Sequence, residues 1–197
     1  MSRLTFSKAA LQKQTTNLKR YRQYLPSLDL KRQQLMAERS RAQNKLAEVE
    51  RNIQRCQQFI STNLPMLSAT IPDLQGLVTI TQLEIGSENV VGINLPLLQT
   101  LQIQVKDYST YCRPHWVDQV VLQLQSMLEL QLQQQIYAQR VMVLAQAVKK
   151  VTQRVNLLDK VLIPRSLQNI RRIRIFLSDT ERAGVVRAKL TKQKQVD

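Results

Sequence analysis

Apolar residues recur every seven positions through the first third of the chain. One row is interrupted by two arginines, and a second row lies three and four residues away from it. The first row is Leu4, Leu11, Leu18, Leu25, Arg32, Arg39, Leu46, Ile53, Ile60 and Leu67, and the second is Tyr21, Leu28, Leu35, Ala42, Val49 and Cys56. Two apolar rows at this spacing are typical of a coiled-coil seam. The pattern predicts a helix over about residues 5–63.

The last third of the chain carries the same repeat. Its rows are Val120, Met127, Gln134, Val141, Val148, Val155 and Leu162, and Leu130, Tyr137, Leu144, Val151 and Leu158. A seven-residue repeat drifts by ~20° per heptad on a straight helix, so helices that keep it wind around each other left-handedly. The first helix would be ~85 Å long at 1.5 Å per residue. We therefore expect the two helices to pair antiparallel, with a kink at Pro26 and a bend at Pro164.

The middle of the chain follows a different period. Three of the four glycines and four of the six prolines fall between residues 65 and 114. Residues 77–85 alternate and are rich in β-branched side chains, residues 86–89 are turn formers, and residues 90–95 can return as a second strand. The pattern predicts a short β-hairpin. Because two strands alone are marginally stable in water, we expect the hairpin to pack against the coiled coil or against a partner. Its candidate accessory residues are Leu77, Ile80, Leu83, Ile85, Val90 and Ile93.

The predicted fold is all-α, a long antiparallel two-helix left-handed coiled coil with a short β-hairpin in the middle segment. We divide the chain into an N-terminal helix over 1–63, a middle segment over 64–114 and a C-terminal helix over 115–197, in one elongated domain. With 43% hydrophobic residues the chain is too apolar for plain disorder. No apolar run approaches the ~18 residues of a membrane span, so no direct membrane insertion is expected. For the basic start, a mitochondrial transit peptide is the alternative interpretation.

The charge is concentrated in two segments of the chain. Residues 1–32 hold eight bases and one acid, residues 149–197 hold thirteen bases and four acids, and the whole chain has a net charge of +15. Antiparallel pairing would bring both segments to one end, with +16 there and −1 elsewhere. A solvated coiled-coil face usually alternates in sign. The one-sided excess instead favours an acidic partner for this end.

Residues that carry catalysis are scarce. His115 is the single histidine, and Cys56 and Cys112 are the two cysteines. The sequence therefore has too few histidines to favour a histidine metal site or a Ser-His-Asp triad. Neither of the phosphate-binding motifs GxxxxGKS/T and GxGxxG occurs. We expect no catalytic residue, no metal and no cofactor. Both cysteines are expected to be reduced thiols, with a Cys56–Cys112 disulfide as the alternative.

Three segments near the C-terminus resemble a known family. They are Thr152–Asp159, Val161–Pro164 and Ile170–Leu177. The chain is similar there to the D subunit of the V-type and A-type rotary ATPases, whose pattern reads RRVNALE followed by a hydrophobic residue with Ile-Pro. Here Gln153 stands in place of the first Arg and Asp159 in place of the Glu. The resemblance extends over nearly the whole chain, including Leu30–Leu35, which stands where the family has LLKxKRDxL.

The resemblance implies the central rotor shaft of a V/A-type ATPase, a non-catalytic component that transmits torque between a catalytic hexamer and a membrane ion-translocating ring. The implied partners are the A and B subunits of the hexamer, which receive both termini, with the F subunit and the socket protein of the rotor ring at the middle. The implied location is cytoplasmic, on the inner face of the cell membrane. Carried over to matching positions, the candidate hexamer-contact residues are Arg154, Asn156, Ile163, Pro164, Ile170, Arg171, Arg172, Ile173, Arg174, Glu181 and Arg182.

Two other functions remain open on the residues alone. A generic coiled-coil scaffold would be indifferent to ATPase subunits. A basic nucleic-acid-binding protein would lose affinity steeply as salt rises. The bases do not form a short block with interleaved aromatics, and no helix-turn-helix or zinc-finger spacing is present. We therefore expect no nucleic acid among the partners.

Overall fold

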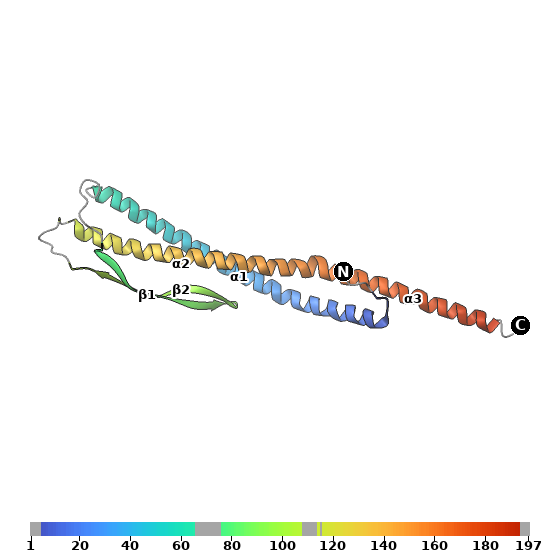
Figure 1. The fold of residues 1–197 in the computed structure, drawn as a ribbon. Coiled ribbons are helices and arrows are strands. Elements are labelled where there is room, and N and C mark those ends of the chain that lie inside the picture. The colour runs from blue at the N-terminus through green and yellow to red at the C-terminus, as the bar shows by residue number, and fades with distance from the viewer. Residues whose placement is uncertain (1–4, 66–75, 108–113, 115, 194–197) are drawn as a thin grey trace. The chain divides into compact units, whose positions relative to one another are not determined.

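The computed structural model describes residues 5–65, 76–107, 114 and 116–193. Most of these residues are helical, as the heptad pattern predicts, and the two strands form an antiparallel hairpin (Figure 1). In chain order the elements are α1 (Lys8–Asn63), β1 (Val78–Val90), β2 (Ile93–Val105), α2 (Val117–Asn156), the π-helical segment η2 (Leu157–Leu162) and α3 (Ile163–Gln193). Leu4, Leu67, Cys112 and His115, which the sequence singles out, lie outside the described residues.

The chain forms two compact units. Unit 1 comprises Met1–Arg32 and Lys149–Asp197, and unit 2 comprises Gln33–Val148. Unit 1 therefore contains the first part of α1 together with the end of α2, η2 and α3. Unit 2 contains the rest of α1, the hairpin and most of α2.

The heptad rows form the buried faces of the helices within these units. Every described member of the four rows is buried or half-buried, and Leu35 and Leu144 are only 0% and 1% exposed. Arg32 and Arg39, which interrupt the first row, are half-buried as well, and the Nε of each is buried without a hydrogen-bond partner among the described residues. The predicted rows are confirmed as inward-facing positions, and left-handed supercoiling stays a prediction.

Side-chain contacts show the direction in which the helices meet inside each unit. In unit 2 the Lys45 Nζ lies 5.9 Å from the centroid of the Tyr137 ring, and Cys56, farther along α1, shares a groove with Leu130, earlier in α2. In unit 1 the rings of Phe6 and Phe176 lie 5.0 Å apart. Residues 9–21, farther along the chain than Phe6, face residues 162–172, which precede Phe176. The facing segments are therefore antiparallel in both units.

The two prolines inside the helical regions have different effects. The helix α1 continues through Pro26, so the lost hydrogen bond does not end it. Before Pro164 the chain forms the six-residue π-helical segment η2, and the Ile163 N–H donates to the Leu158 carbonyl, five residues back. Proline has no N–H and its ring crowds the preceding turn, and a wider π turn relieves that crowding. The kink predicted at Pro26 and the bend predicted at Pro164 stay predictions.

The hairpin is longer than the sequence predicts, and its turn lies elsewhere. The strands pair from Val78↔Val105 to Val90↔Ile93, with Val91 and Gly92 at the turn, both at positive φ (53° and 77°). Two such residues in a row are typical of a type I′ turn. The predicted turn at residues 86–89 is therefore wrong, since these residues belong to β1.

Side chains around the turn explain its position. The Asn89 Oδ1 accepts a hydrogen bond from the Gly92 N–H at 3.0 Å, and the Asn89 Nδ2 donates to Asn94 Oδ1 at 2.9 Å. Gly86, which suggests a turn in the sequence, lies within β1, where an added Cβ would meet the Gln99 side chain. The asparagine pair closes the turn, and the glycine makes room for a side chain from the opposite strand.

The base of the hairpin is part of the core of unit 2. Leu77, 3% exposed, packs in one cluster with Leu64, Trp116 and residues at the start of α2. Val78 and Val105, the first strand pair, pack against the same cluster. Leu77 is therefore a core residue and not part of an accessory surface, whereas the remainder of the hairpin extends from this core.

Candidate functional site

All of the net positive charge lies in unit 1. It contains twenty-one of the twenty-nine lysines and arginines and five of the fourteen aspartates and glutamates, which gives +16 against −1 for unit 2. Two ion pairs are seen in its described part: Arg32–Asp29 at 2.7 Å and Lys8–Glu181 at 3.8 Å, the latter with both side chains at least 70% exposed. Most of the described cationic side chains of this unit are exposed.

The candidate contact residues divide into an outward and an inward set. The outward side chains, all exposed, are Arg154, Asn156, Pro164, Arg171, Arg172, Arg174, Glu181 and Arg182. Ile163 is half-buried. Ile170 and Ile173 are 6% and 0% exposed, so they lie in the core of unit 1 and are not available for direct contact. The isoleucines hold α3 in place, and the arginines between them point outward.

Exposed apolar side chains on α3 add to this surface. They are Ile175, Phe176, Val185, Val186 and Leu190, each about half exposed. Val185 and Val186 line a surface groove with Ser178, Glu181 and Arg182. The Phe6–Phe176 contact was not predicted from the sequence, because the two rings are 170 positions apart and Phe6 belongs to no heptad row. A surface that mixes arginines with exposed apolar groups is typical of a protein interface.

The hairpin carries a second exposed apolar surface, in unit 2. Ile80, Leu83 and Ile85 are 40%, 40% and 56% exposed, whereas Val90 and Ile93 beside the turn are half-buried. Leu95, two residues after Ile93, is 1% exposed. The apolar side chains of the hairpin are thus buried at its base, half-buried beside the turn and exposed along the middle of β1.

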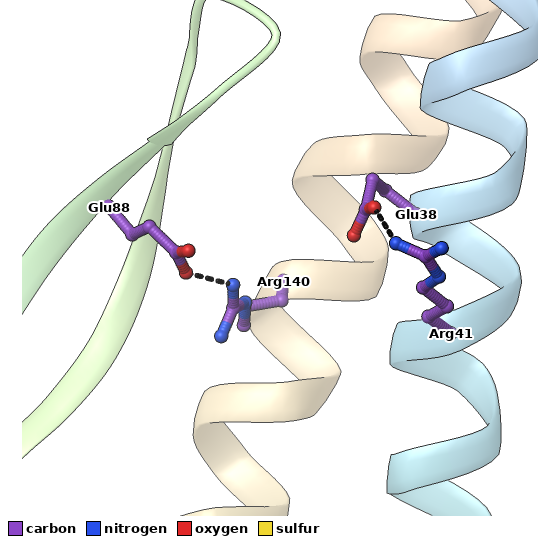
Figure 2. Close-up of polar contacts among 4 residues, drawn as sticks. All are labelled: Glu38, Arg41, Glu88 and Arg140. Atoms are coloured by element: carbon purple, nitrogen blue, oxygen red, sulfur yellow. Dashed lines mark hydrogen bonds and ion pairs between the residues drawn. The ribbon is translucent and has the colours of Figure 1, made fainter.

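An ion pair joins the hairpin to α2. Figure 2 shows the Arg140 guanidinium directed at the Glu88 carboxylate, with Nη2 donating to Oε2 at 2.7 Å. The Arg140 side chain is 14% exposed and that of Glu88 is 48% exposed. No periodicity in the sequence signals this contact, since the two residues lie 52 positions apart in different elements. It fixes the outer part of the hairpin against the helix.

Residues 5–65, 76–107, 114 and 116–193 contain no group of three or more His, Cys, Asp or Glu side chains placed to hold a metal ion. Within the same ranges, every helix is too short or too polar to cross a bilayer. Cys56 is half-buried, and the predicted alternative of a Cys56–Cys112 disulfide lies outside the described residues.

The chain is similar to known proteins over almost its full length. The family model for the D subunit of ATP synthase matches residues 10–193. A V-type ATP synthase D subunit from Borreliella burgdorferi is 29% identical over 192 residues, covering 98% of this chain and 95% of that protein. Proteins of the same name from Chlamydia caviae and Chlamydia muridarum are 27% and 29% identical, each covering 98% of this chain and 94% and 95% of their own.

Proposed function

Because the chain belongs to the family of ATP synthase D subunits, we propose that it is the central rotor shaft of a V-type or A-type ATPase. In this role it transmits torque between the catalytic hexamer of A and B subunits and the ion-translocating ring, and it performs no catalysis itself. The observation that carries the proposal is the charge of unit 1, +16 against −1 in unit 2. A shaft that enters an acidic cavity needs its positive charge at the inserted end.

Electrostatics supports insertion of unit 1 into a partner. Two like-charged helical segments repel each other when isolated, and an acidic surface around them converts that repulsion into attraction. The exposed Arg154, Arg171 and Arg174 would meet carboxylates of the hexamer, while Ile170 and Ile173 keep α3 packed. The helices would wind as a left-handed coiled coil, which gives the rod the stiffness that torque requires.

The middle of the chain would serve the other partners. We place the F subunit and the socket protein of the rotor ring at unit 2, where the hairpin exposes Ile80, Leu83 and Ile85. Apolar groups of this kind are suited to the core of a protein interface. The complex would hold this chain peripherally, on the inner face of the cell membrane.

Neutralising exposed arginines of unit 1 tests the proposal. The triple variant Arg154→Gln, Arg171→Gln, Arg174→Gln should melt at the same or a higher temperature in isolation, because exposed charges are worth ~0–1 kcal/mol each and here they repel. The same variant should assemble more weakly with the catalytic subunits, and its assembly should depend less on salt. Co-purification and ATP-driven rotation measure this.

The matched control removes the same charge from unit 2, with Arg41→Gln, Arg51→Gln and Arg55→Gln, all at exposed positions. This control should assemble with the hexamer like the parent. If the unit 1 variant also assembles and rotates normally but loses tight, salt-sensitive binding to duplex DNA, the rotor role is wrong. The nucleic-acid-binding alternative would then replace it.

A further inference from the structure

The described residues that line one cleft in unit 1 include cations and no anion. The cleft lies between the start of α1 and the junction of η2 with α3, with a volume of about 870 Å³. Lys13 approaches from α1, and Arg165 and Arg172 approach from α3. No Asp or Glu is among its described lining residues, and no ion pair joins these three cations to a carboxylate in the described ranges. The positive potential of the cleft is therefore not neutralised from within.

Neutral hydrogen-bonding side chains line the same cleft. Gln14 and Asn17 on α1 face Ser166 and Asn169 on α3 across the cleft, and Ser166 is only 5% exposed. Amides and hydroxyls beside Lys and Arg are the groups that proteins use to bind phosphate oxygens. We propose that this cleft binds the phosphate chain of a small polyphosphate.

Size and spacing favour an extended small anion. The volume falls within the ~300–1,000 Å³ of small-molecule sites. Arg165 and Arg172 are seven residues apart, about 10.5 Å along the helix axis, so a chain of phosphates can contact both where a single phosphate reaches one. Apart from two alanines, Tyr21 and Leu162 are the apolar lining residues, too few to anchor an amphipathic peptide. Polyphosphate binding does not depend on the rotor role, because residues of this chain alone line the cleft.

Calorimetric titration of the full chain with tripolyphosphate tests the site. The titration contains no magnesium and is done at ~0.1 M NaCl, where exposed charges are screened beyond ~10 Å. We expect saturable one-to-one binding. The variant Lys13→Gln, Arg165→Gln, Arg172→Gln should weaken it at least tenfold. The control Lys149→Gln, Lys160→Gln, Lys189→Gln removes the same charge from exposed positions of unit 1 outside the cleft and should weaken it less than threefold. Equal weakening in the two variants, or no saturable binding, overturns the proposal.

Two further arms make the result specific. Ala9→Leu narrows the cleft without changing the charge, so it should weaken tripolyphosphate binding at least fivefold even if the charge variant fails to fold; unchanged binding would refute the site. ATP separates the sources of the phosphate chain. Tighter binding of ATP means that a nucleoside also contacts the cleft, and equal binding means that the phosphates suffice, and both support the proposal. Tighter binding of an octaglutamate peptide overturns it in favour of an acidic protein segment.

Discussion

Breaking the ion pair between Glu88 and Arg140 should release the hairpin tip from α2. The Arg140 side chain is 14% exposed and donates to Glu88 at 2.7 Å, so Glu88→Ala leaves a mostly buried guanidinium without its carboxylate. A hydrogen bond to a charged group contributes ~1.5–3 kcal/mol, which we reduce to ~1–2 kcal/mol because Glu88 is half exposed. This corresponds to roughly a 5- to 30-fold change in the equilibrium between docked and released hairpin.

A double-mutant cycle separates the coupling energy between Glu88 and Arg140 from the packing energy that Arg140→Ala also removes. Glu88→Ala, Arg140→Ala and the double variant are compared by amide hydrogen exchange of residues 90–95, under conditions where exchange follows the opening equilibrium. The control is the Glu38–Arg41 pair within α1, also drawn in Figure 2, whose arginine side chain is 73% exposed. Its coupling should be ~0.2–0.5 kcal/mol, as for other surface pairs on one helix. If the Glu88–Arg140 coupling is no larger than that of the control, the hairpin is held by its apolar contacts alone.

Four other substitutions test the packing and the hairpin turn, each by urea denaturation or hydrogen exchange. Leu35→Ala, at a 0% exposed position, should lower the free energy of unfolding by ~2–5 kcal/mol. Its control, Met36→Ala at a 53% exposed position, should lower it by less than ~0.5 kcal/mol. Similar losses in the two variants would contradict the buried row. Arg39→Leu should raise stability by ~1–2 kcal/mol, because it removes a buried unpaired Nε, and a loss would show that the arginine is satisfied. Val91→Asn should slow exchange at the hairpin turn by relieving a β-branched residue at φ 53°, worth ~1 kcal/mol, and faster exchange would refute the strain.

The heptad rows could be predicted from the sequence, because they depend on residue spacing along one helix. The charge division could be predicted as well, because it follows from the composition of residues 1–32 and 149–197 once the two helices pair antiparallel. A side chain seven positions from another lies on nearly the same face whatever the helix meets, so the rows that contain Leu11 and Val120 identified the buried faces. The family resemblance was equally readable, since its motif lies within residues 152–177 and the family match covers residues 10–193.

The hairpin turn and the pairings between distant segments were decided by tertiary structure. Gly86 and its neighbours have turn composition, but the strand register depends on the Asn89–Asn94 pair and on the fit of Gln99 over Gly86. The Glu88–Arg140 ion pair joins two elements through residues 52 positions apart, and no repeat in the sequence predicts that contact. The cleft between the start of α1 and α3 likewise brings Lys13 opposite arginines about 150 residues later. Such contacts depend on which faces of separate elements meet, and local spacing does not determine that.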